Sequence, residues 1–301
     1  MLSHILDTHV VRGAAHAGGA PELLVEVPHG ATATADYDAV ARLLASPLPD
    51  GLVDFFHVNT DTGAPELALA LAERFVARFP TRAVTVLRCR IPRTFIDCNR
   101  VLDLTAADYK AGGVAPGLMP WIEDARDRAL LVGAYAEYVA AVRAARDALP
   151  RDGAMLLLHT YAPRTVGVEV DRDIVKSLHH AYAPGVVETW PLRPELDVIA
   201  RAGAGADAVS HAPPVLLSAL RLAYGRIGMQ VGESATYGLH PSTLGWEHVL
   251  ALPGRAVCIE LRRDLFVERF EPFVEAAIDP ARVDALAEPL VAALASWWPT
   301  A

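Results

Sequence analysis

The sequence predicts an α/β fold in which a mainly parallel sheet is covered by helices. Continuous apolar runs, typical of strands buried on both faces, alternate along the chain with segments of helical periodicity. A hydrophobic fraction of 52% in 301 residues is enough for a large core. The sequence contains no internal repeat or convincing linker, and we therefore expect a single catalytic domain over residues 1–301.

Five apolar runs predict the strands of this sheet, at 22–27, 52–58, 83–87, 154–159 and 256–261. Helical periodicity predicts helices at 65–79, 121–149, 213–226, 267–278 and 281–297. Pro65 suits the first turn of a helix, where its missing N–H is not needed. The polar segment 103–120 is long enough to form a wall of an active site.

The charge balance argues against two classes of partner. A formal net charge of -9 and a pI of about 5.6 disfavour binding to nucleic acid or to an anionic membrane surface. No run approaches the ~18 apolar residues of a membrane helix, and the N-terminus lacks the pattern of a signal peptide. Cys89, Cys98 and Cys258 suit reduced, buried thiols, so we expect a cytoplasmic protein.

A cluster of charged and amide side chains follows the third predicted strand. Arg93, Asp97, Asn99 and Arg100 lie within eight residues. Two arginines and an asparagine suit a carboxylate receptor, because the guanidinium group binds carboxylates bidentately and the amide adds a donor. Asp97 could hold one arginine in place. The alternative is a solvated surface turn, since arginine is the default cation of a chain with 25 Arg and 2 Lys.

Three predicted strands end in a residue that can ligate a metal: His29, Asp61 and His159. Ligands of open α/β sheets bind beyond the carboxyl ends of the strands, where these residues could meet. Two histidines, one carboxylate and a fourth position left to water form a catalytic zinc site. Each histidine could instead be a hydrogen-bonded loop residue, and Asp61 a helix cap. Glu66 is the alternative carboxylate ligand.

Glu260 lies inside the apolar run 256–261, where an ionised carboxylate is costly without a partner. It is either paired with an arginine such as Arg262 or kept as a general base with a raised pKa. Two further candidates could contact a substrate. Arg164 follows His159 closely, and His240 lies in a Gly-rich stretch.

Five motifs together resemble the N-formylglutamate amidohydrolase family. They are Pro28-His29-Gly30, Asn59-Thr60-Asp61, Arg93 with Asp97-Cys98-Asn99-Arg100, His159-Thr160, and Ile259-Glu260-Leu261-Arg262. The resemblance covers about residues 22–270. It implies a central mixed sheet flanked by helices, a fold similar to that of zinc carboxypeptidases and aspartoacylase-like deacylases, and a single zinc ion.

The resemblance also implies a role for each matching residue. His29, His159 and Asp61 would bind zinc, and Glu260 would act as general base. Arg93 would lie near the scissile carbonyl, and Asn99 with Arg100 would bind the substrate α-carboxylate.

We therefore interpret the chain as a zinc-dependent amidohydrolase acting on a small acidic N-acyl amino acid. The expected reaction is the deformylation of N-formyl-L-glutamate to formate and L-glutamate, as in histidine degradation. One alternative is a carboxypeptidase or a deacylase for another N-acyl acidic amino acid. The other is a non-catalytic protein that binds an acidic metabolite. The sequence leaves the oligomeric state open.

Overall fold

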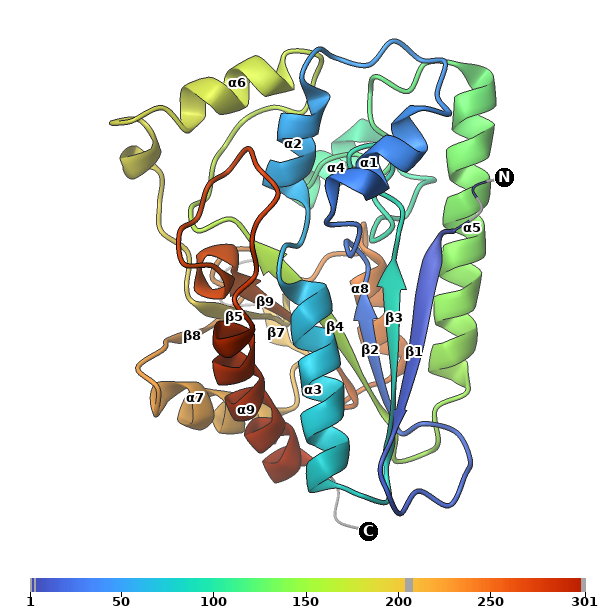
Figure 1. The fold of residues 1–301 in the computed structure, drawn as a ribbon, viewed down its shortest axis with the longest axis vertical. Helices are drawn as coiled ribbons and strands as arrows, with labels where there is room; N and C mark the ends of the chain where they lie inside the picture. Colours follow the sequence, from blue (N-terminus) through green and yellow to red (C-terminus); the bar gives the residue numbers. More distant parts are fainter. Residues whose placement is uncertain (1, 3, 204–207, 299–301) are drawn as a thin grey trace.

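A seven-stranded sheet forms the centre of the computed structural model, which describes residues 2, 4–203 and 208–298 (Figure 1). Its spatial order is β1-β3-β2-β4-β9-β5-β8. The strands are β1 (Leu6–Arg12), β2 (Leu23–Val27), β3 (Ala83–Cys89), β4 (Ala154–Tyr161), β5 (Leu196–Ile199), β8 (Val231–Glu233) and β9 (Ala256–Arg262). A separate pair consists of β6 (Arg201–Ala202) and β7 (Val209–Ser210).

The sheet is mixed and mainly parallel, which confirms the predicted fold class. β3, β2, β4 and β9 run parallel, so their carboxyl ends meet at one edge. β1 is antiparallel to β3, and β5 is antiparallel to β9. Because β5 and its parallel neighbour β8 run the other way, their amino ends lie at the edge where the parallel strands finish.

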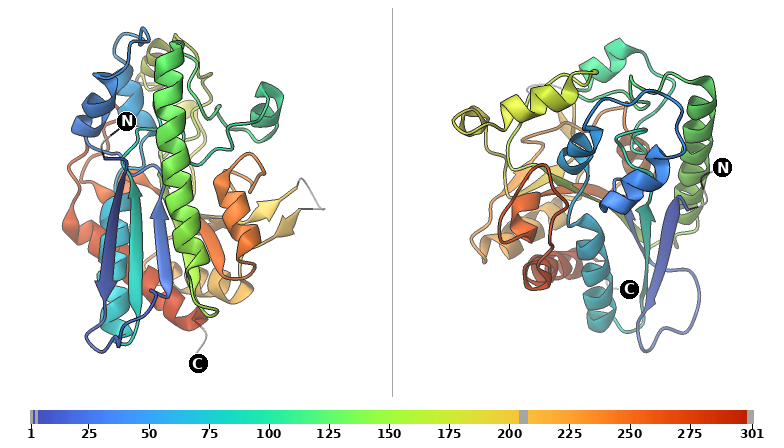
Figure 2. Two further views of the ribbon diagram at one scale, coloured as in Figure 1. Left: turned by 90° about the vertical axis from the view of Figure 1, so that its right-hand side faces the viewer. Right: turned by 45° about the horizontal axis from the view of Figure 1, so that its top comes forward.

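Helices cover both faces of the sheet. One face packs against α3 (Ala64–Arg78), α7 (Pro214–Gly225) and α9 (Pro280–Trp297), and the other against α5 (Ala125–Asp147) and α8 (Leu244–Ala251) (Figure 2). α1 (Thr34–Ala41), α2 (Leu52–Asn59), α4 (Ala106–Ala111) and α6 (Ile174–Ala181) lie beyond the carboxyl ends of the parallel strands, at the top of Figure 1. Among the described helices, none is long and apolar enough to cross a membrane.

The central strands bury side chains on both faces, which explains their continuous apolar sequence. In β4, Leu156 and Leu158 pack with α3 and α9, whereas Met155 and Leu157 pack with the helices of the opposite face. Glu26 interrupts this pattern in β2. Its carboxylate is buried and accepts a hydrogen bond of 2.8 Å from the Tyr138 hydroxyl of α5, so Glu26 belongs to the core.

Two of the predicted elements are wrong. Residues 52–58 form helix α2 instead of a strand, with Leu52, Phe55 and Phe56 buried on one side. Short apolar runs fit either structure, and here the spacing of buried residues is helical. Residues 267–278 do not form a helix, and Pro272 lies in the middle of this segment, where it removes a backbone donor. The other predicted helices and strands are confirmed within a few residues of their predicted ends.

The packing predicts a large loss of stability on truncation of Leu156. This side chain is 1% exposed at the centre of the sheet, so Leu156→Ala should lower the free energy of unfolding by ~2–5 kcal/mol. Urea denaturation followed by circular dichroism measures the change. Leu222 of α7 is 60% exposed, and Leu222→Ala should cost no more than about 0.5 kcal/mol. Equal losses in the two variants would contradict the described core.

Candidate functional site

A cavity of about 270 Å³ is lined by residues from the carboxyl ends of β4 and β9, the loop after β2, α2, α6 and the loop after β3. Seven predicted site residues line it: His29, Arg93, Asn99, Arg100, His159, Arg164 and Glu260. The segment 103–120, predicted to be an active-site wall, contributes Gly113, Val114, Ala115 and Met119. The edge of the sheet where the parallel strands end is therefore hollow and lined with polar groups.

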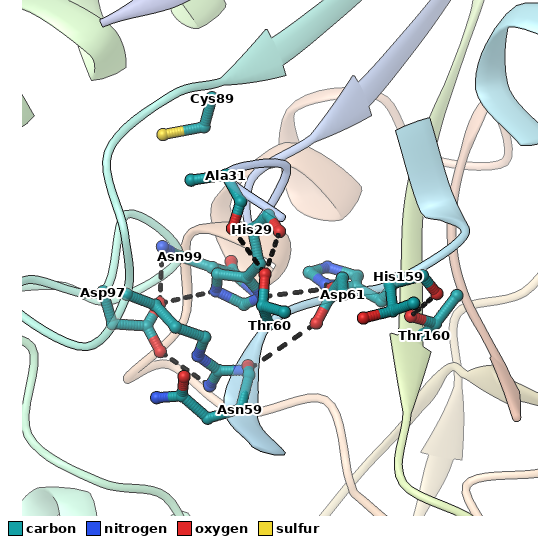
Figure 3. Close-up of polar contacts among 12 residues, drawn as sticks. His29, Ala31, Asn59, Thr60, Asp61, Cys89, Asp97, Asn99, His159 and Thr160 are labelled. Atoms are coloured by element: carbon teal, nitrogen blue, oxygen red, sulfur yellow. Dashed lines mark hydrogen bonds and ion pairs between the residues drawn. The ribbon is translucent and has the colours of Figure 1, made fainter. Parts of the chain in front are cut away.

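His29, Asp61 and His159 form a buried cluster in which one ligand atom from each residue lies within 4.8 Å of the others (Figure 3). The Asp61 Oδ2 atom lies 3.2 Å from His29 Nδ1 and 2.9 Å from His159 Nδ1. Burial by itself would raise the pKa of the Asp61 carboxyl, but the two imidazoles hold it below its usual value. The ligand atoms of the three side chains are thus close enough together to bind a single ion.

The hydrogen bonds of this cluster suit a divalent metal ion. His29 Nε2 lies 2.8 Å from Asp97 Oδ1, and a neutral imidazole has one N–H to donate. If that N–H points to Asp97, the lone pair of His29 Nδ1 faces the Asp61 carboxylate, and a cation between them would relieve the repulsion. A carboxylate behind a histidine is the usual support of a metal ligand. In addition, His159 Nε2 is buried without a partner among the described residues.

The backbone between α2 and α3 brings Asp61 to the histidines. Thr60 Oγ1 donates to the Ala31 carbonyl at 2.5 Å, and Asp61 N–H donates to the His29 carbonyl at 3.3 Å. These hydrogen bonds hold the segment between α2 and α3 against the loop after β2. Glu66, the alternative ligand, lies in the first turn of α3 and is not part of this cluster. The structure therefore groups Asp61, rather than Glu66, with the two histidines.

Asp97 is the centre of the polar network. Its side chain is 0% exposed and accepts hydrogen bonds from Arg93 Nη2 at 2.9 Å and from the Asn99 N–H at 2.9 Å, in addition to its contact with His29. Arg100 Nη2 lies 3.4 Å away. Burial would raise the pKa of the Asp97 carboxyl, but Arg100, His29 and Arg93 hold it well below its usual value. Asp97 thus orders both arginines and one candidate ligand.

The two residues predicted to bind a carboxylate line the cavity with some of their donors already engaged. Arg100 donates from Nε to the Ala115 carbonyl and from Nη1 to the Asn99 carbonyl. Asn99 accepts a hydrogen bond from the Gly245 N–H through its amide oxygen, at 3.0 Å, which leaves the amide N–H groups for other partners. Arg93 Nε is buried without a partner among the described residues.

Glu260 lies beside the cluster because β9 pairs in parallel with β4, with Glu260 opposite His159. Its side chain lines the cavity, and Oε2 has no partner in the described part of the chain. Burial raises the pKa of the Glu260 carboxyl above its usual value. Arg262 is not its partner, because that guanidinium group contacts Asp264 and Glu195 instead. Of the two alternatives that the sequence left open for Glu260, an ion pair with Arg262 is therefore excluded.

The remaining sequence candidates have different positions. Arg164 lines the cavity, but its Nη1 donates to the Glu188 and Trp190 carbonyls. His240 is not among the described residues that line the cavity; its ring contacts Ser242 Oγ at 2.9 Å. Its predicted role in substrate binding therefore has no support from its position.

The sequence analysis did not select two buried arginines that line the cavity, Arg193 and Arg263. Arg263 follows β9 directly, so the rule that selected His29 and His159 applies to it as well. Its Nη2 donates to the Thr160 carbonyl at 3.1 Å and lies 3.5 Å from Asp61 Oδ1. Arg193 precedes a strand, and no such rule selects it.

Known structures share this arrangement of strands and helices, whereas no protein family and no curated protein matches the sequence. An N-formylglutamate amidohydrolase from Ralstonia eutropha JMP134 superposes with a TM-score of 0.59 at 17% identity, covering 98% of each chain. A gene product of Agrobacterium tumefaciens superposes with a TM-score of 0.56 at 20% identity, covering 98% of this chain and 95% of the other. The chain has the fold of an N-formylglutamate amidohydrolase. The resemblance in its motifs is thus confirmed at the level of the fold.

The cluster predicts stoichiometric binding of zinc. The wild-type chain should bind one zinc ion, and His29→Ala and His159→Ala should each abolish this binding, because each removes one of three ligands. Mass spectrometry of metals in purified protein measures the stoichiometry, and circular dichroism checks the fold. Glu66→Ala is the matched control for Asp61→Ala. Full zinc occupancy in either histidine variant, or loss in Glu66→Ala with retention in Asp61→Ala, would contradict this ligand set.

The contacts of Asp97 predict an indirect effect on the same ion. Asp97→Asn keeps the shape of the side chain but removes the charge behind His29, so zinc affinity should fall about 10–100-fold. Competition with a chromogenic chelator measures the dissociation constant. Unchanged affinity would show that Asp97 does not support His29 as a ligand.

Proposed function

We propose that the protein is a zinc-dependent hydrolase that cleaves the amide bond of an N-acyl amino acid, with N-formyl-L-glutamate as the first substrate to test. The observation that carries the proposal is the buried cluster of His29, Asp61 and His159, whose two histidines line the same cavity as Glu260. The Oε2 atom of Glu260 has no partner among the described residues. The fold shared with an amidohydrolase supports it.

His29, Asp61 and His159 would hold the zinc ion, which when bound polarises a carbonyl group and lowers the pKa of water. The cluster supplies two neutral nitrogen ligands and one carboxylate, a donor set that zinc accepts. Asp97 would orient His29 by accepting a hydrogen bond from its Nε2, which lies 2.8 Å from Asp97 Oδ1, and Arg263 lies against Asp61 Oδ1. Both contacts keep the ligands in place before a substrate arrives.

Glu260 would move the proton during hydrolysis. Its carboxylate accepts a proton from the attacking water while the water oxygen forms a bond to the amide carbonyl carbon. The same proton passes to the amide nitrogen as the C–N bond breaks, which releases a carboxylic acid and an amine. For N-formyl-L-glutamate the products are formate and L-glutamate. Burial raises the pKa of the Glu260 carboxyl above its usual value, which makes the carboxylate a better proton acceptor.

Arg93, Asn99 and Arg100 would position the substrate and stabilise developing charge. The buried Nε–H of Arg93 has no partner among the described residues and is available to an oxyanion. The amide N–H groups of Asn99, together with the Arg100 guanidinium, would bind the α-carboxylate. Arg164, on the same cavity wall, is the remaining candidate for a substrate contact.

Substitution of Glu260 tests the proposed reaction. Glu260→Gln should keep zinc binding and lower kcat for N-formyl-L-glutamate at least ~10²-fold, because an amide does not accept the proton. Release of L-glutamate measures the rate. Glu26→Gln is the matched control, since Glu26 is also a strand glutamate but contacts Tyr138 in the core. It should leave kcat near that of the wild type.

Two outcomes would count against this assignment. Near-normal turnover in Glu260→Gln would remove the general base from the mechanism. Absence of hydrolysis by the zinc-loaded wild type, tested with N-formyl, N-acetyl and peptide substrates, would favour the non-catalytic binding protein.

A further inference from the structure

Arg193 is a buried cation of the cavity to which the proposed reaction gives no role. It lies in the loop before β5 and is 8% exposed. Its guanidinium carbon lies 4.9 Å from the ring centre of Tyr161 and 5.2 Å from that of Tyr237. Two aromatic rings thus restrain the group while it lines the same cavity as His159 and Glu260.

The hydrogen bonds of Arg193 go to neutral oxygens. Nε donates to Thr165 Oγ1 at 3.2 Å, Nη1 to the Ala162 carbonyl at 3.3 Å, and Nη2 to the Tyr237 hydroxyl at 2.7 Å. A guanidinium group has five N–H donors, so two have no partner among the residues that the structure describes. In residues 2, 4–203 and 208–298, no carboxylate oxygen lies within 4.0 Å of this side chain.

Three other buried or half-buried arginines that line the cavity have a carboxylate neighbour, whereas the half-buried Arg164 donates to backbone carbonyls. Arg93 and Arg100 contact Asp97, and Arg263 contacts Asp61. The positive charge of Arg193 partly offsets the rise that burial causes in the pKa of the Asp197 and Glu260 carboxyls, but Arg193 contacts neither group. A buried charge without a contacting counter-ion is costly, and cation–π contacts with two tyrosines offset a part of this cost.

The sheet order places Arg193 apart from the predicted carboxylate receptor. The loop that carries Asp97, Asn99 and Arg100 follows β3 and contacts His29 after β2, whereas Arg193 precedes β5 on the far side of β9. Glu260 on β9 and His159 on β4 come between them in the order of the strands. A substrate with two carboxylates could therefore engage both receptors with its amide bond near Glu260.

We propose that Arg193 is a specificity-determining residue that binds a carboxylate of the substrate. The two free N–H groups, held by the tyrosine rings, provide the planar fork that a carboxylate requires. The identity of the substrate as an N-acyl acidic amino acid rests on the proposed function, but the anion-binding role of Arg193 does not. An N-acyl acidic amino acid offers two carboxylates, on the α-carbon and on the side chain.

Three substrates distinguish these two sources. N-formyl-L-glutamate has both carboxylates, N-formyl-L-glutamine lacks the side-chain carboxylate, and N-formyl-L-isoglutamine lacks the α-carboxylate. Arg193→Gln should lower kcat/KM for N-formyl-L-glutamate at least about 30-fold. Loss on isoglutamine but not on glutamine assigns Arg193 to the side-chain carboxylate, and the reverse assigns it to the α-carboxylate. Arg193→Lys should recover part of the loss, because it restores the charge without the fork.

The matched control is Arg201→Gln, which removes an exposed arginine just beyond the other end of β5. It should leave kcat/KM unchanged on all three substrates. Equal loss in Arg193→Gln on the three substrates would make Arg193 a structural residue and overturn the proposal. No loss on any of them would overturn it as well.

A binding measurement separates this inference from the proposed function. Glutarate, a dicarboxylate without an amide bond, should bind the zinc-loaded wild type, and its dissociation constant by calorimetry should rise at least about 30-fold in Arg193→Gln. If the wild type hydrolyses none of the three substrates but shows this difference, the proposed reaction fails and the carboxylate receptor stands. If glutarate binds the wild type and Arg193→Gln equally, or binds neither, the receptor is wrong.

Discussion

One carboxylate without solvent exposure, Asp97, receives the imidazole of His29, the guanidinium groups of Arg93 and Arg100, and the backbone of Asn99. The negative charge of Asp97 compensates the positive charges of Arg93 and Arg100, which lie close together, and these charges in turn keep Asp97 ionised. Removal of this single group would leave Arg100 without a contacting carboxylate, Arg93 with only Asp61 at 3.8 Å, and His29 without its second hydrogen-bond partner.

Much of the site could be predicted from the sequence because residues after parallel strands converge at one edge of a sheet. By that rule His29 and His159 are expected at one edge of the sheet, and the structure brings them together there. Asp61 was selected for the wrong reason, since it follows a helix, and hydrogen bonds from the α2–α3 junction bring it into place. Arg193 was missed because β5 is antiparallel to β9, so the residues before β5 reach the same edge of the sheet as the residues after β9. Strand direction is not visible in the sequence.

Glu26 and Glu260 show why a buried glutamate in an apolar strand is ambiguous in the sequence. Both interrupt continuous apolar runs, and both lie on the face of the sheet that α5 and α8 cover. Glu26 is level with Leu157 of β4 and contacts the Tyr138 hydroxyl, whereas Glu260 is level with His159, two residues nearer the carboxyl edge, and lines the cavity. The register in the sheet, rather than the residue type, separates a core contact from a group that a ligand can reach.

The position of β9 has a consequence for the order in which the molecule can be completed during synthesis. β9 comprises Ala256–Arg262 and follows the other strands of the sheet in sequence, yet it is inserted between β4 and β5 in the middle of the sheet. Until residues 256–262 leave the ribosome, β4 and β5 each have one unpaired edge. Unpaired edges can pair with other chains, so the sheet is exposed to this hazard until its central strand has been synthesised.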